Sequence, residues 1–327
     1  PSLNLDKIKI YDSIESIEHV EAVFDTDDVC IDDENSPSNR RIIKNNLTKA
    51  AKYFRAAALQ GDAEAMNNYG LMLMKGEGVP VNLKEAQKFF QMSADKGNSF
   101  GQNNLGVLLK NIDPEKATHL FCQSAKQHNL SGMNNYGLML MKSEDEKDRI
   151  EALSLFKTAA DEGHVNAMYN YATMAIKEIK KGFVIYDTQD QENSEQNDRP
   201  DSEQLNVVST DSLMDKYMKD SADLGDVDAM ICYASYVYRH KKETKTAAFY
   251  YRMAVDKGNP KAMNKLASLI RDNLDKESGF IEDDFEKSKK EMLDLYQRAI
   301  DLENTDAMNN LASLYYMGSY VEKDVEK

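Results

Sequence analysis

A phrase of seven residues recurs along the chain and constrains its fold more than any other feature. It reads EAMNNYG at 64–70 and ends its series as DAMNNLA at 306–312. A second phrase alternates with it, as in KYFRAAALQG at 52–61 and KFFQMSADKG at 88–97. Each phrase occurs seven times, and the unit is about 31–36 residues long, with two longer gaps of 62 and 45. Repetition at such a period predicts a repeat architecture.

Each unit has the pattern of two helices. In the first phrase Ala65, Tyr69 and Met72 form an apolar stripe at helical spacing, and Ala86, Phe89, Phe90 and Ala94 do so in the second helix. A glycine that suits a left-handed helix end follows most second helices, at Gly61, Gly97, Gly163, Gly225 and Gly258. Residues that can cap the next helix come directly after it, at Asp62, Asn98, Asp226 and Asn259. One helix pair buries only one side, so the pairs must stack.

These motifs are similar to those of a known family. The first helix reads A-x-x-N-[LY]-G, the loop KGEGVPVNLKEA follows at 75–86, and the second helix ends in ADKG. This pattern resembles Sel1-like repeats, relatives of the tetratricopeptide repeat (TPR), from about residue 48 to 327. The resemblance implies an all-α fold, a right-handed α-solenoid of stacked helix pairs, that acts as a scaffold without catalysis of its own. We therefore expect about seven helical pairs over residues 47–327.

The negative charge of the chain is concentrated in two segments that lie outside the repeat. The formal net charge is −15, and residues 12–34 contain ten acids and no Lys or Arg. Residues 182–209 contain seven acids and one arginine. We predict that 1–46 is an acidic, partly disordered N-terminal segment with a short helix near 12–24, and that helix resumes near Arg40. We predict a flexible acidic insertion at 182–209 and a charged loop at 273–286.

Several classes of function are disfavoured by the sequence. It has no basic stripe for nucleic acid and no run of about 20 apolar residues for membrane insertion. The three cysteines are widely spaced, which favours a reducing compartment; we expect the cytoplasm, with the nucleus left open. The five histidines form no metal-ligand pair, and no nucleophile motif is present. We therefore expect no cofactor, no metal and no enzymatic activity.

Asparagines of the first phrase are the candidate partner-binding residues. At one position of the phrase the side-chain amide could hold an extended peptide backbone on a concave face, or satisfy polar groups inside the stack. The residues at this position are Asn68, Asn104, Asn135, Asn170 and Asn310, while Cys232 and Lys265 interrupt the series. The preceding position is expected to face solvent, at Asn67, Asn103, Asn134 and Asn309.

The predicted function is protein–protein interaction, as a scaffold or adaptor for a protein or peptide partner. Two alternatives stay open: a regulatory repeat region of a larger, for example kinase-linked, enzyme, and a hydrolase of the β-lactamase-like Sel1 type. Sel1-like proteins associated with β-lactam binding carry a regular cysteine pair in each repeat, and this chain lacks those pairs. In the N-terminal segment, Val29, Cys30 and Ile31 between acids could also add a strand to a partner's sheet.

The last repeat has the pattern of a truncated unit. GSYVEKDVEK from Gly318 aligns with GEGVPVNLKE from Gly76, and in the complete unit that loop is followed by a second helix. We expect the first helix of this unit to lack its partner, with Leu311, Leu314 and Tyr315 partly exposed. Self-association through the ends of the solenoid is left open.

Deleting Gln189–Gln204 should leave the melting temperature nearly unchanged. The segment is acidic and has too few aliphatic residues to offset the entropy of ordering it. Thermal unfolding followed by circular dichroism checks this. A loss of more than a few degrees would show that the segment packs on the solenoid.

Overall fold

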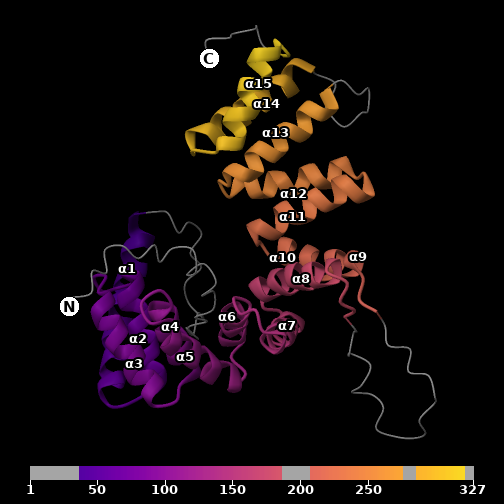
Figure 1. The fold of residues 1–327 in the computed structure, drawn as a ribbon. Coiled ribbons are helices and arrows are strands. Elements are labelled where there is room, and N and C mark those ends of the chain that lie inside the picture. Colours follow the sequence, from indigo (N-terminus) through magenta and orange to yellow (C-terminus); the bar gives the residue numbers. More distant parts are fainter. Residues whose placement is uncertain (1–36, 186–206, 275–284, 321–327) are drawn as a thin grey trace, which may run out of the picture. The chain divides into compact units, whose positions relative to one another are not determined.

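The computed structural model describes residues 37–185, 207–274 and 285–320, and the fold in these residues is all-α, as predicted (Figure 1). The predicted helix near 12–24 and the acidic run that follows it lie outside the described residues. So do residues 186–206 of the predicted insertion and most of the predicted charged loop. The described chain divides into two compact units, at residues 1–164 and 165–327.

The first unit is a stack of alternating first and second helices (Figure 1). Its helices are α1 (Pro37–Leu59), α2 (Ala63–Lys75), α3 (Leu83–Asp95), α4 (Ser99–Leu109), α5 (Pro114–Lys126), α6 (Leu130–Leu140) and α7 (Glu146–Asp161). The first phrase forms α2, α4 and α6, and the second phrase lies in α1, α3, α5 and α7. Each helix packs against the next one in the chain. Helix α1 spans the boundary between residues 46 and 47, at which the sequence predicts the start of the solenoid.

The second unit continues the same alternation. Its helices are α8 (Val165–Lys180), α9 (Thr210–Leu213), α10 (Lys219–Asp223), α11 (Val227–Tyr236), α12 (Thr244–Asp256), α13 (Pro260–Leu274), α14 (Phe285–Asp301) and α15 (Thr305–Met317). A π-helical turn, Met214–Met218, joins α9 to α10, so that these three pieces form one second helix. Another π-helical turn, Val237–Lys241, extends α11.

The helix ends follow the predicted pattern. The five glycines after second helices have positive φ, between 78° and 106°. His128 and Glu303 occupy the place of this glycine in their repeats, with φ of 62° and 61°. The side chains of Asp62, Asn98 and Asp226 each accept a hydrogen bond from a backbone N–H three residues later, at 2.6–2.8 Å. These caps satisfy amides that the first turn of each helix leaves unpaired.

Small residues let the helices of a pair approach closely. A Cβ atom on Gly70 would lie 2.7 Å from the ring of Phe90, which is too close for a real contact. Gly106 has the same relation to Phe121. The predicted core stripes Ala65–Tyr69–Met72 and Ala86–Phe89–Phe90 are buried. In the pairs α2–α3, α4–α5 and α6–α7 an aromatic ring of the second helix therefore takes the space that a side chain on the first helix would fill.

Replacing Ala262 with leucine should lower the free energy of unfolding by about 1–3 kcal/mol. Ala262 and the equivalent Ala307 are both fully buried, so three added carbon atoms have no room at either position. Chemical denaturation of the Ala262→Leu and Ala307→Leu variants measures the effect. Midpoints like that of the wild type would contradict the packing of both first helices.

The last described helix departs from the prediction in one respect. Leu311 and Tyr315 are half-buried, as expected, but Leu314 is only 1 % exposed. Helix α15, which carries Leu314, packs against α14. The side of α15 that is exposed carries Met308, Ala312 and Tyr316.

Candidate functional site

The candidate asparagines lie on the first helices, at two adjacent positions of the phrase. Asn67, Asn103 and Asn134 are only 4–5 % exposed, so the expectation that they face solvent was wrong. The fourth residue of that set, Asn309, is exposed, as predicted. At the other position Asn104 is buried, and its counterparts are half-buried, namely Asn68, Asn135, Asn170 and Asn310.

In the first unit these side chains form a continuous chain of hydrogen bonds, which we call the asparagine ladder. Within α2 the Asn67 amide donates to Oδ1 of Asn68 at 3.2 Å, and within α4 Asn103 donates to Asn104 at 3.4 Å. Between helices, Asn104 donates to Oδ1 of Asn67 and Asn135 donates to Oδ1 of Asn103, both at 2.8 Å. The ladder therefore joins α2, α4 and α6 through side chains alone.

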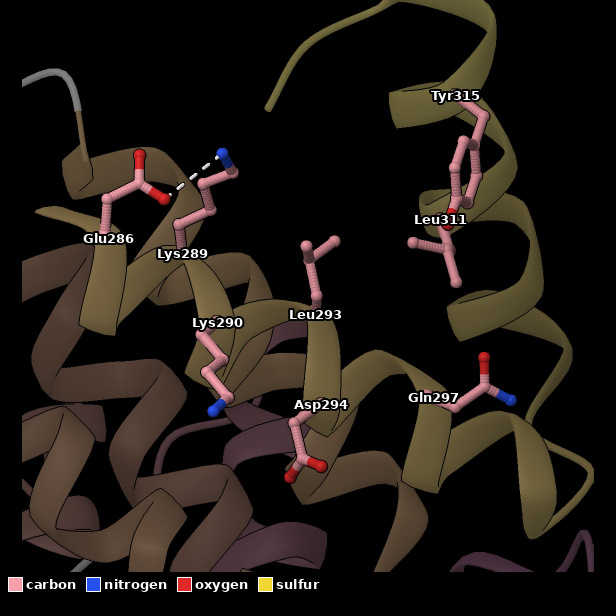
Figure 2. Close-up of a pocket in the computed structure, with 8 residues that line it drawn as sticks. All are labelled: Glu286, Lys289, Lys290, Leu293, Asp294, Gln297, Leu311 and Tyr315. Atoms are coloured by element: carbon pink, nitrogen blue, oxygen red, sulfur yellow. Dashed lines mark hydrogen bonds and ion pairs between the residues drawn. The ribbon is translucent and has the colours of Figure 1, made fainter. Parts of the chain in front are cut away.

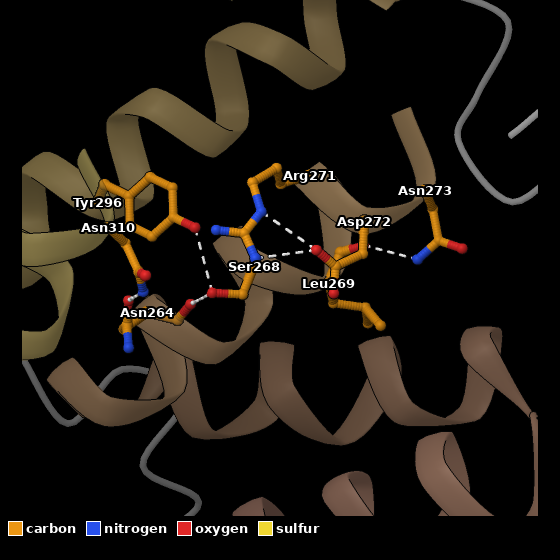
Figure 3. A network of polar contacts seen from close by, with 8 residues as sticks. All are labelled: Asn264, Ser268, Leu269, Arg271, Asp272, Asn273, Tyr296 and Asn310. Atoms are coloured by element: carbon orange, nitrogen blue, oxygen red, sulfur yellow. Dashed lines mark hydrogen bonds and ion pairs between the residues drawn. The ribbon is translucent and has the colours of Figure 1, made fainter. Parts of the chain in front are cut away.

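The second unit repeats one rung of this arrangement. The Asn310 amide of α15 donates to Oδ1 of Asn264 on α13 at 2.8 Å (Figure 3). Asn264 is buried and takes the same place in its phrase as Asn67. The sequence analysis missed this residue because Lys265 interrupts the series next to it. Comparing the preceding phrase position across all seven copies would have found it.

A hydroxyl pair lies beside this rung. Ser268 of α13 and Tyr296 of α14 are joined through their hydroxyl groups at 3.1 Å (Figure 3). Ser235 and Tyr251 form the equivalent pair one repeat earlier, at 2.8 Å. Tyr251 and Tyr296 occupy the position of Phe90, so the second unit replaces a purely apolar contact with a hydrogen-bonded one.

The first helices of the first unit contact one another directly. Helix α2 packs directly against α4, and α4 against α6, as well as against the second helices beside them. The close helix pairs do not include α3 with α5 or α5 with α7. The asparagine ladder therefore runs along the side of this unit on which the first helices contact one another.

In the first unit the ladder offers neutral donors and acceptors alone. In the second unit Cys232 takes the place of Asn68 in its phrase, and burial raises the pKa of its thiol above the ordinary value. A thiol that stays protonated is a poor nucleophile.

In the part of the chain that the structure describes, no group of three or more His, Cys, Asp or Glu side chains could hold a metal ion. No described helix is long and apolar enough to cross a bilayer.

Comparison with solved structures supports the fold. Over 88 % of this chain and 58 % of the other, the structure matches c5321, described as a protective antigen of uropathogenic Escherichia coli with an SLR fold, at 20 % identity and a TM-score of 0.66. It matches a Sel1 repeat protein from Oxalobacter formigenes over 79 % of this chain and 98 % of the other, at 21 % identity and a TM-score of 0.57. The chain thus spans less than two thirds of the length of c5321. No curated protein matches the chain in sequence.

The sequence pattern described as the Sel1 repeat matches six stretches that together make up more than half of the chain. These stretches are residues 40–62, 63–98, 99–129, 130–164, 234–259 and 305–327. They coincide with the alternating helices, and the first of them covers a second helix alone. The chain belongs to the Sel1 repeat family.

Proposed function

We propose that the chain is a non-catalytic scaffold or adaptor whose first unit binds an extended segment of a partner protein on its concave side. The observation that carries the proposal is the asparagine ladder, a line of amides that crosses three first helices. Sel1 repeats generally mediate protein interactions. The partner segment would lie across α2, α4 and α6, as peptides do in other solenoids with a concave binding surface.

The ladder has hydrogen-bonding capacity left for a peptide backbone. An asparagine amide carries two N–H donors and an oxygen with two lone pairs. Within the ladder Asn67, Asn103 and Asn104 each use one donor and one acceptor on neighbouring amides. The half-buried ends, Asn68 and Asn135, are the members that a partner reaches first. Paired donors and acceptors recognise an extended backbone without a charge requirement.

Site-specific photo-crosslinking tests the face. A photoreactive amino acid is placed at Asn68 or Asn135, and for comparison at Met92, which is 40 % exposed on the second helix α3. We expect the same partner polypeptide to be crosslinked from both asparagine positions and not from Met92. Equal crosslinking from Met92, or none from the asparagine positions, would overturn the assignment of the face.

Binding measurements with that partner test the residues. The Asn68→Ala/Asn135→Ala double variant should bind about tenfold more weakly, because a few central contacts dominate an interface. Asn309→Ala, an exposed asparagine of the other unit, should bind like the wild type. Melting temperatures measured in parallel separate lost binding from lost folding.

A further inference from the structure

Helix α4 carries an exposed aromatic residue where every other copy of the first phrase has a polar one. Phe100 opens the copy FGQNNLG and is 59 % exposed. The residues at this position in the other six copies are Glu64, Ser131, Asn166, Asp228, Lys261 and Asp306. The fold therefore does not need an aromatic side chain here. A single exposed apolar residue means little by itself, so its surroundings decide what it does.

Phe100 lies beside the centre of the asparagine ladder. It precedes Asn104 by four residues, so both side chains lie on the same face of α4. Val107 follows Asn104 by three residues on this face and is half-buried. On α4 the ladder is therefore flanked by one apolar side chain a turn before it and another a turn after it.

The apolar side chain after the ladder has neighbours on α6, which packs against α4. Leu138 follows Asn135 by three residues and is half-buried, and Met141 is 43 % exposed one turn further on. We call Val107, Leu138 and Met141 the apolar strip. On α2 the equivalent residue, Leu71, is buried, so the strip belongs to α4 and α6.

The strip distinguishes the first unit from the second. In the second unit the position of Val107 and Leu138 carries a hydroxyl group in all four copies, namely Thr173, Ser235, Ser268 and Ser313. The three serines each donate a hydrogen bond to the carbonyl four residues earlier in their own helix, at 2.8–2.9 Å. A first helix therefore folds with either kind of side chain at this position, and the two units differ in the surface that they present.

An extended peptide segment fits between Phe100 and the apolar strip. Its successive side chains point to opposite sides of the backbone, so a backbone on the ladder directs them alternately toward Phe100 and toward the strip. The axes of packed helices lie about 9 Å apart, so α2, α4 and α6 together cover about 18 Å. About six extended residues, at ~3.3 Å each, span this length.

We propose that the first unit binds an extended segment of about six residues whose three central residues are apolar. The middle residue of the three packs on Phe100, and the residues before and after it pack on the apolar strip. This segment is the partner segment of the proposed function, so its recognition rests on binding along the ladder. The amides hold the backbone whatever its sequence, and the apolar contacts select the side chains, as in strand addition to a sheet. A charged residue among the three would lose its water without gaining a partner.

Selection of peptides from a random library tests this chemistry. Decapeptides displayed on phage are selected on the purified full chain, and separately on its Phe100→Ser variant. We expect the peptides enriched on the wild type to share three consecutive apolar residues flanked by neutral polar ones, and the variant not to enrich them. Enrichment of peptides that carry charge in place of the apolar residues, or of no peptide, overturns the proposal.

Fluorescence anisotropy with the most enriched peptide tests the residues. Phe100→Ser and Leu138→Ser should each weaken binding at least tenfold, because each removes a central apolar contact. Serine stands at both positions in other copies, as Ser131 and Ser268, so melting temperatures measured in parallel should stay close to that of the wild type. Phe249→Ser, at a 56 % exposed aromatic residue of α12, is the matched control and should bind like the wild type. Undiminished binding by Phe100→Ser overturns the proposal.

A groove between α14 and α15 is the competing place for an apolar peptide. Figure 2 shows Leu293 of α14 opposite Leu311 and Tyr315 of α15. Leu293→Ser should bind the peptide like the wild type. Weaker binding by Leu293→Ser, together with wild-type binding by Phe100→Ser, would place the peptide in the groove and contradict the proposal.

The Asn68→Ala/Asn135→Ala double variant separates the recognised chemistry from the proposed function. If it loses binding while Phe100→Ser and Leu138→Ser keep it, the ladder holds the backbone and only the apolar recognition is wrong. If all three bind like the wild type, both proposals are wrong. Loss of binding in all three, with folding intact, supports both.

Discussion

Replacing Gly78 with alanine should lower the free energy of unfolding by about 3 kcal/mol, far more than an exposed loop substitution usually costs. Gly78 has a φ of +70°, where a residue with a Cβ atom is strained. A Cβ atom there would also lie 2.3 Å from the backbone carbonyl of Leu47 on α1. Backbone atoms of a helix cannot turn aside as the end of a side chain can, so the loop or α1 must shift.

Gly97→Ala is the matched control for this prediction. Gly97 has a similar φ of +82°, but nothing lies within 4 Å of its added Cβ atom. Its substitution should therefore cost about 1 kcal/mol, the strain of the left-handed conformation alone. Both variants lose the same backbone freedom in the unfolded chain. Urea titrations of the two, followed by circular dichroism, isolate the close approach. Equal midpoints would mean that the loop at 76–82 does not rest on α1.

The residues that repeat most regularly allowed most of the fold to be predicted. The apolar stripe of each phrase gave the helices, and the glycine followed by Asp or Asn gave their ends. His128 shows that a helix end can keep its conformation even where glycine is replaced by another residue. The turn imposes a positive φ at this position, and His128 adopts it at 62° without being glycine. The two π-helical turns were not predictable, because one additional residue in a helical turn leaves no signal in an apolar pattern of this length.

The burial of Asn67, Asn103 and Asn134 could not be read from one helix. Seen alone, the first helix has one apolar stripe, and a residue one step beside it falls at the border with solvent. In the stack α2 is covered by α1, α3 and α4 together. The contact with α4 covers the border positions too. Buried polar side chains need hydrogen-bond partners, and here the asparagines supply them to one another.

Asn104→Ala should lower the free energy of unfolding by about 2–4 kcal/mol. Asn104 lies at the centre of the ladder, where it donates to Asn67 and accepts from Asn103. Truncation leaves one buried acceptor and one buried donor without a partner, and each costs about 1–3 kcal/mol. Alanine is the better helix former, which returns about 0.5 kcal/mol of that loss.

Asn309→Ala controls for helix propensity, because Asn309 is exposed on a first helix. It should change stability by less than about 0.5 kcal/mol. Denaturant unfolding of both variants gives the difference. If Asn104→Ala is as stable as Asn309→Ala, the ladder does not hold the first helices together, and its amides are satisfied by other means. If it is destabilised as expected, the buried centre of the ladder serves the stack. Each half-buried end, Asn68 or Asn135, is bonded to a single buried amide, so its loss should cost the fold less than the loss of Asn104 while it removes a group that a partner reaches.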